Sequence, residues 1–322
     1  MLKHLLILSL CLIFSATGSI AQQGMILYSE TPETHRKSEL LAALAVEIRE
    51  LTDGRVMADA VSAESGLFAG EQEAIAAMIE GDVQMIWPTV GRLEQYAPEF
   101  GLLTLPYSVE TLSLRDDEAQ TELSAALTAL LKDSDIAVLG LAPSSHTLIV
   151  SKSPISSAQD LAGKTVRVPG SPMLLDYVSE LGATGVNLPA PDLPTMMAEE
   201  RVDVVMTSFG GWKILGPENG RYVLMDPGMR IGLYGIIVNK SWLDSLDADD
   251  RAAISSATKK TIALRWSELA EEMAAIKEAM AAAGTTLTEI TEENAAPFKS
   301  AADTVRNKYV SQSPDFAAEF FQ

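Results

Sequence analysis

Chemically useful side chains stand where predicted strands end, and the clearest of them is Arg167. The residues from Thr165 to Val168 alternate polar and apolar, which predicts a short buried strand, and Pro169-Gly170 ends it. In open α/β sheets, ligands bind beyond the carboxyl ends of the strands. An arginine at that place offers a planar fork of donors that matches a carboxylate or a phosphate. The alternative is an arginine that pairs with an acidic residue on the surface.

Further candidates follow two other predicted strands. Trp87 ends one of them, and Thr207, Phe209 and Trp212 follow another. Trp87 is equally compatible with packing in the core. Together with Arg167, these residues supply one cation among aromatic rings and a hydroxyl group, without a base or a nucleophile. Such a set suits the binding of an organic anion better than its chemical conversion.

His146 is the candidate that could support catalysis. The run Ser144-Ser145-His146 suggests a hydrolase, yet the sequence has no G-x-S-x-G nucleophile elbow. It also has no glycine-rich phosphate loop, and no His, Asp and Glu cluster has metal-ligand spacing. We therefore expect no metal and no cofactor. His146 joins the ligand-binding candidates as a loop residue near a crossover between lobes, and a periplasmic hydrolase that uses it stays an alternative.

The N-terminus predicts a secretory signal peptide over residues 1–21. Lys3 precedes an almost wholly apolar run from Leu5 to Phe14, and Ser19-Ile20-Ala21 is a small-x-small cleavage site. The run is too short for a membrane-spanning helix. Cys11, the single cysteine, lies inside the signal, so the mature chain has no disulfide and no thiol nucleophile. The expected location is the periplasm.

The charge of the chain excludes some partners. The formal net charge is -20. Nucleic acid binding needs Lys and Arg against phosphates, so such acidity argues against it and against anionic membrane surfaces. A small anionic ligand is not excluded, because a local cationic pocket can exist in an acidic protein.

The elements that must position these residues predict an α/β protein with two lobes. Strand and helix patterns alternate along the chain, which indicates mainly parallel sheets. Residues 245–284 form the longest helical pattern, about 36 residues or about 54 Å, so this helix either spans both lobes or breaks near Ser256 or Arg265-Trp266. We expect lobe I to comprise 22–143 with about 232–276, and lobe II to comprise 144–231 with about 277–322.

Segments spread over nearly all of the mature chain resemble the solute-binding subunits of TRAP transporters, the dicarboxylate-type extracytoplasmic receptors. The most specific is DLAGKTVRVPGSP at 160–172, which resembles the family's Asp-Leu-x-Gly-Lys-x-Arg-x-Pro core. In that core the arginine binds the carboxylate of the ligand. The other similar segments are EIRELTDGRV (47–56), SGLFAGEQEAIAAMIEGDVQM (65–85), LTLPYSVET (103–111) and ERVDVVMTSFGGW (200–212).

The resemblance implies a type II periplasmic-binding-protein-like fold, with a cleft between two lobes and a long helix that braces both. It also implies closure on a small organic acid and delivery to a TRAP-type membrane permease, by a protein that is not an enzyme and that we expect to be a monomer. A sensory binding protein that presents its ligand to a receptor is the alternative.

The chain departs from the family pattern in its expected pocket. Many members carry a second ligand arginine near the position of His146 or Thr147, and this chain has none there. Thr207 stands where an asparagine is common. The clamp through Arg167 carries over, but the rest of the pocket differs. We hypothesise a monocarboxylate with an apolar or aromatic body, in contact with Trp87, Phe209 and Trp212.

Overall fold

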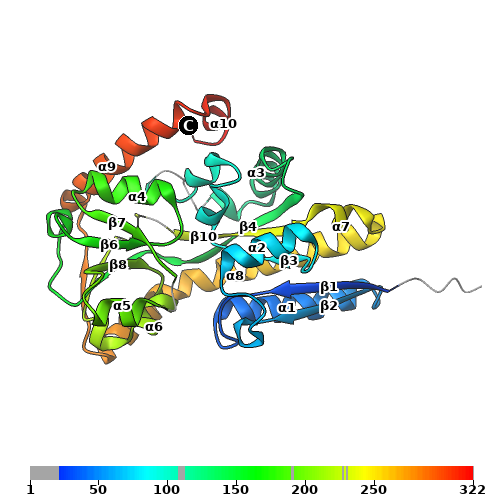
Figure 1. The fold of residues 1–322 in the computed structure, drawn as a ribbon, viewed down its shortest axis with the longest axis horizontal. Coiled ribbons are helices and arrows are strands. Elements are labelled where there is room, and N and C mark those ends of the chain that lie inside the picture. The colour runs from blue at the N-terminus through cyan, green and yellow to red at the C-terminus, as the bar shows by residue number, and fades with distance from the viewer. Residues whose placement is uncertain (1–21, 108–112, 190–191, 227, 230, 322) are drawn as a thin grey trace, which may run out of the picture.

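The computed structural model describes residues 22–107, 113–189, 192–226, 228–229 and 231–321, and the predicted signal peptide at 1–21 lies outside them. The fold has two mixed sheets with helices packed around them, joined by a long helix (Figure 1). This is the expected two-lobed α/β architecture. We call the half with the first sheet lobe I and the half with the second sheet lobe II. The exact lobe limits given above stay predictions.

The sheet of lobe I has the strand order β2-β1-β3-β10-β4. Strand β1 runs parallel to β2 and β3, while β10 runs antiparallel to β3 and β4. Parallel strands need a crossover, and helices supply it here. The strands are β1 (Gln23–Tyr28), β2 (Val56–Val61), β3 (Met85–Ile86), β4 (Ile136–His146) and β10 (Ile231–Asn239).

The sheet of lobe II has the order β11-β9-β5-β8-β6-β7. Strand β6 runs parallel to β7 and β8, and β5 runs antiparallel to β8 and β9. The strands are β5 (Leu148–Ser151), β6 (Thr165–Val168), β7 (Thr184–Asn187), β8 (Val204–Thr207), β9 (Tyr222–Met225) and β11 (Thr286–Glu289). The predicted strand around Arg167 is therefore confirmed.

The helices differ widely in length, and none of those described is long and apolar enough to cross a membrane. They are α1 (Arg36–Leu51), α2 (Glu71–Glu80), α3 (Asp117–Leu130), α4 (Pro172–Glu180), α5 (Leu193–Ala198), α6 (Phe209–Asn219), α7 (Lys240–Ser245), α8 (Ala248–Ala282), α9 (Glu292–Val310) and α10 (Pro314–Phe320).

Helix α8 connects the two lobes. It is one uninterrupted helix, so of the two predicted alternatives the helix that spans both lobes is confirmed and the break near Ser256 or Arg265-Trp266 does not occur. It packs on α1 and β4 of lobe I and on β11 of lobe II. Its residues also enter two separate hydrophobic clusters: Trp266 belongs to the large one, and Ile276 belongs to the smaller one in lobe II. A single helix thus links the cores of the two lobes (Figure 1).

Two predictions about local structure are wrong. We expected His146 in a loop, but β4 continues through it because β10 pairs along the whole length, with Ile231 opposite His146. The sequence pattern also missed α6, whose two adjacent glycines and Pro217 hide its helical character. Ser208 begins this helix, since its Oγ accepts a hydrogen bond from the Gly211 N–H at 3.1 Å.

The core of lobe I gives a stability test on one helix. Leu44 of α1 is fully buried, while Val46, two residues further, is 44% exposed. Leu44→Ala leaves a cavity and should lower the free energy of unfolding by about 2–5 kcal/mol in urea titrations. Val46→Ala is the matched control and should stay within about 0.5 kcal/mol of the parent protein. Equal losses in both variants would contradict this packing.

Candidate functional site

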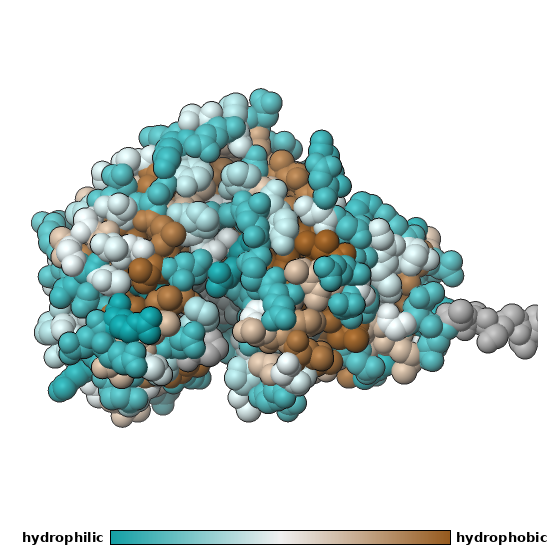
Figure 2. Space-filling view, in the orientation of Figure 1, coloured by the Kyte–Doolittle hydropathy of each residue, from teal (hydrophilic) through white to brown (hydrophobic). Residues whose placement is uncertain are grey.

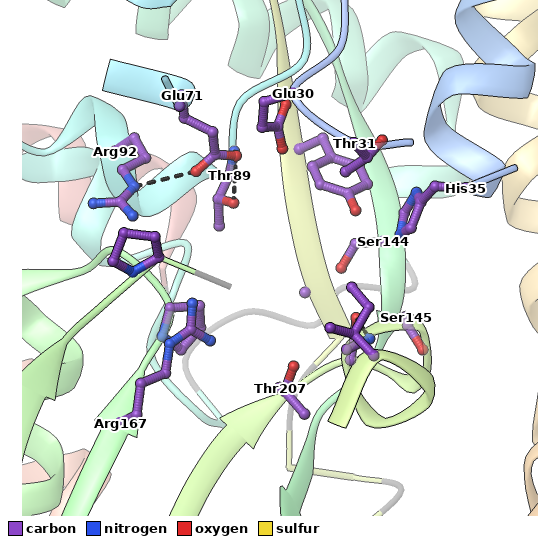
Figure 3. Close-up of a pocket in the computed structure, with 18 of the residues that line it drawn as sticks. Glu30, Thr31, His35, Glu71, Thr89, Arg92, Ser144, Ser145, Arg167 and Thr207 are labelled. Atoms are coloured by element: carbon purple, nitrogen blue, oxygen red, sulfur yellow. Dashed lines mark hydrogen bonds and ion pairs between the residues drawn. The ribbon is translucent and has the colours of Figure 1, made fainter. Parts of the chain in front are cut away.

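A cavity of about 200 Å³ lies between the lobes, at the strand ends that the sequence singled out. In Figure 2 a notch in the outline separates the two halves of the molecule, and Figure 3 shows the side chains that converge on the cavity. Its volume is below the roughly 300–1,000 Å³ of pockets for drug-sized ligands. Lobe I contributes Glu30, Thr31, Pro32, His35, Glu71, Thr89, Arg92, Ser144 and Tyr234, and lobe II contributes Arg167, Pro169, Pro189, Thr207, Ser208 and Ile214.

Arg167 carries a buried charge in the cavity wall. Strand alternation buries Val166 and Val168 in the core and turns Arg167 the other way, where it is only 5% exposed. Its Nε donates to the Leu188 carbonyl at 3.0 Å and its Nη1 to the Met206 carbonyl at 3.2 Å. Within the described part of the chain no carboxylate pairs with it, so the alternative of a surface ion pair is not found.

The electrostatics of Arg167 reflect that isolation. Burial, together with the positive charge of Arg92, lowers the pKa of Arg167 to about 10, although Glu71 opposes the shift. The guanidinium therefore stays protonated at neutral pH, but in a place that disfavours a charge. An anion in the cavity would relieve that cost.

Arg92 and Glu71 form an ion pair on the lobe I side. Arg92 Nε lies 3.1 Å from Glu71 Oε2. The other oxygen, Glu71 Oε1, accepts hydrogen bonds from the Thr89 N–H and hydroxyl, both at 2.8 Å. Burial opposes the charge of Glu71, but Lys37, Thr89 and Arg92 outweigh it and lower the pKa of this carboxyl. Glu71 is thus an ionised, fixed anchor for Arg92 (Figure 3).

A second ion pair lies deeper in lobe I. Lys37 Nζ contacts Glu30 Oε1, donates to the Trp87 carbonyl at 3.3 Å and lies 4.7 Å from the Tyr234 ring centre. Burial raises the pKa of the Glu30 carboxyl above its usual range, against the opposing charge of Lys37. Lys37 is therefore already engaged, and its charge is not free for a ligand.

His35 links α1 to the start of α6. Its Nδ1 accepts a hydrogen bond from the Lys37 N–H at 3.1 Å and so caps α1. A Cβ added to Gly210 would lie 2.9 Å from His35 Nε2, which shows how closely the imidazole approaches α6. Burial, with the charges of Lys37 and Arg265, lowers the pKa of His35 to about 4. The ring is therefore neutral at neutral pH.

The structure brings some of the sequence candidates together and separates others. Arg167 and Thr207 line the cavity, and Phe209 lines a neighbouring cavity of about 290 Å³. Trp87 lies in the lobe I core, where only its carbonyl reaches the ion pair. Trp212 stacks on Phe209 at 5.7 Å and donates from Nε1 to the Gly220 carbonyl at 3.1 Å, so it packs within lobe II.

His146 does not line either cavity. Its Nδ1 is buried with no hydrogen-bond partner in the described structure, and burial and Arg265 lower its pKa. Ser145 Oγ instead accepts a hydrogen bond from the Phe209 N–H at 3.3 Å. The serine and the histidine therefore do not form the nucleophile–base pair that a hydrolase needs.

Sequence reasoning missed Glu30, Glu71 and Arg92 as cavity residues. Each carries a charge on a loop or at a helix start, and such residues usually lie on solvated surfaces. The available signal was position, since Glu30 follows the first strand and Arg92 follows the third. Among the described residues, no group of three or more His, Cys, Asp or Glu could hold a metal ion.

Comparisons with known proteins identify the family and the fold. The model of the family described as "Bacterial extracellular solute-binding protein, family 7" matches residues 27–313. A solute-binding protein of Roseobacter denitrificans is 27% identical over 270 residues, which cover 80% of this chain and 77% of that protein.

Solved structures show the same fold. A TRAP periplasmic solute-binding protein from Sulfitobacter with bound β-D-galacturonate has a TM-score of 0.81 at 19% identity, covering 93% of this chain and 99% of that one. One from Pseudomonas aeruginosa with bound L-malate has a TM-score of 0.80 at 16% identity, covering 89% and 100%.

His35 predicts a pH dependence of stability. Its pKa is about 4 in the folded state and about 6.5 when unfolded, so the unfolded chain binds the proton more tightly. The resulting stability is complete above pH 6.5 and is lost as the pH falls towards 4, by up to about 1.4 kcal/mol per pH unit. His35→Asn keeps an N-cap acceptor without the titration. Urea titrations should show the parent losing stability faster than this variant over that range; parallel curves would contradict it.

Proposed function

The chain belongs to family 7 of the bacterial extracellular solute-binding proteins, and we propose that it captures a small organic acid whose carboxylate binds Arg167 in the interlobe cavity. The family consists of non-enzymatic receptors. The observation that carries the proposal is the buried guanidinium without a carboxylate partner in the described structure.

Physical chemistry supports a carboxylate at this place. A guanidinium and a carboxylate form a charge-assisted, bidentate pair, and the pair gains strength where water is excluded. Arg167 uses only two of its donors on carbonyl oxygens, so its outer face stays available. The ligand carboxylate then pairs with the Arg167 guanidinium, which has no carboxylate partner in the described residues of the unliganded protein.

The body of the ligand faces mostly polar side chains. Hydroxyl groups of Thr31, Ser144, Thr207 and Ser208 line the cavity. Trp87 and Trp212 are absent from the wall, and Phe209 lines the neighbouring cavity, so the structure gives no support to a body held by these rings. We therefore propose a hydroxylated or otherwise polar organic acid. The Sulfitobacter and Pseudomonas proteins bind acids of that kind, galacturonate and malate.

The family also supports a setting for this capture. We propose that the signal peptide directs the chain to the periplasm and that the loaded protein delivers its ligand to a TRAP-type membrane permease. Delivery to a sensory receptor would use the same cavity. Uptake of the ligand by cells with and without the permease distinguishes the two, because only delivery to the permease makes uptake depend on it.

Removing the guanidinium should separate binding from stability. Arg167→Ala leaves the ligand carboxylate unpaired in a buried site, which costs about 3–5 kcal/mol and weakens binding by two orders of magnitude or more. The unliganded variant should melt no lower than the parent, because a buried unpaired charge has been removed. A thermal-shift screen against organic acids, followed by calorimetry of the best one, measures both.

Arg201→Ala is the matched control for this experiment. Arg201 lies in the same lobe, is largely exposed and pairs with Glu199 at 3.5 Å. It should bind the acid like the parent protein. If Arg167→Ala weakens the affinity for the acid by less than about threefold, Arg167 is not the clamp. A change of about threefold is well below the factor of about ten that corresponds to about 1.4 kcal/mol.

A further inference from the structure

We propose that Arg92 is the second half of the carboxylate clamp, so that one carboxylate bridges two guanidinium groups from opposite lobes. This inference rests on the proposed function and adds a residue that the sequence did not suggest. It concerns lobe I, whereas Arg167 lies in lobe II.

The two arginines lie at the same end of the cavity. Arg92 belongs to the short 3-10 helix η2 (Val90–Leu93), which packs on β10 of lobe I. Arg167 lies on β6 of lobe II, and both side chains line the cavity. Figure 3 shows Arg92 and Arg167 on the same, left-hand side of the cavity, with Glu71 above Arg92 and paired with it.

The lobes meet closely beside Arg92. A Cβ added to Gly170 would lie 2.7 Å from Arg92 Nε and 3.0 Å from its Cζ. Gly170 has a φ of +50° and follows Arg167 by three residues. The guanidinium of Arg92 therefore rests on the backbone of the turn that ends β6, where a side chain would displace it.

Arg92 has donors to spare. Glu71 engages its Nε, and within the described part of the chain no hydrogen bond or ion pair uses either Nη. Arg167 likewise has Nη2 without a recorded partner in the described residues. A carboxylate has about four lone-pair sites, enough to accept from both guanidinium groups at once.

The charges make the bridge favourable. Arg92 is one cause of the lowered pKa of Arg167, so the two cations are near enough to repel. Glu71 offsets only part of that charge, because its ion pair is with Arg92 and not with Arg167. A bridging anion removes the repulsion and attracts each lobe to the other. The ligand thereby stabilises a closed arrangement, since it contacts both lobes only there.

The same placement specifies the ligand class. In the described part of the cavity wall, Arg92 and Arg167 supply the guanidinium groups and no lysine is present. Both lie at the same end of the cavity (Figure 3). Lys37, in the interior of lobe I, is engaged by Glu30. A second carboxylate would therefore find no further arginine or lysine in the described part of the wall. The site suits an acid with one carboxylate and uncharged polar groups.

Acetate tests the bridge, because it carries one carboxylate and no other polar group. The measurement is the thermal shift of the mature protein in sodium acetate against sodium chloride at equal ionic strength. Ligand that binds only the native state raises apparent stability by mass action. Arg92→Gln and Arg167→Gln should each raise the apparent dissociation constant of acetate at least about tenfold, a loss of about 1.4 kcal/mol. Arg201→Gln is the surface control and should match the parent.

The outcomes separate this inference from the proposed function. Acetate protection that is lost in Arg167→Gln but kept in Arg92→Gln overturns the bridge alone. Absence of acetate protection in the parent also overturns it. D-galacturonate then tests the function: protection by it that depends on Arg167 keeps the proposed function, and no protection by either acid removes both. If Arg92→Gln does not fold, Arg92→Lys keeps a charge beside Glu71 without the fork and should show an intermediate loss.

Discussion

The site depends on one constraint, the burial of the Arg167 guanidinium without a carboxylate beside it in the described structure. Such a charge costs free energy in an interior, and two carbonyl oxygens repay only part of that cost. The burial of Arg167 follows from its strand, β6, because Val166 and Val168 on the other face belong to the core and fix the orientation of the strand. The fold therefore holds a cation in the cavity wall that the proposed anionic solute would pair with.

The described carboxylates of the cavity wall are paired with other residues and form no ion pair with Arg167. Glu71 engages Arg92 and the Thr89 donors, and Glu30 engages Lys37. Each acid is fixed by a partner from its own lobe, which prevents either from neutralising Arg167. The charged side chains of the wall are thus held in place by their own partners before a ligand enters.

Three connections hold this geometry together. Strand β4 ends at His146 and β5 begins at Leu148, so the sheets are joined by a single residue. The chain returns to lobe I from β9 to β10, and α8 packs against elements of both lobes. Arg265 of α8 donates to the Ser144 carbonyl at the edge of the cavity, which ties the helix to the site. Any change in the angle between the lobes must therefore act through these connections.

The sequence by itself determined the features that depend on local pattern. The strand around Arg167, the long helix and the alternation of strands and helices follow from short-range periodicity and spacing, and each appears in the fold. The motif of 160–172 indicated the family by resemblance. Thr207 could be placed at the cavity because it ends a strand. Tertiary structure decided what lies opposite these residues. Arg92, Glu71 and Glu30 come from loops and a helix start, and no local pattern distinguishes a charged residue on a surface from one turned into a cleft. Two of the three aromatic candidates show the converse. Trp87 and Trp212 stand beside strand ends, but they pack into the cores, since burial of a large apolar surface outweighs its exposure to a polar cavity.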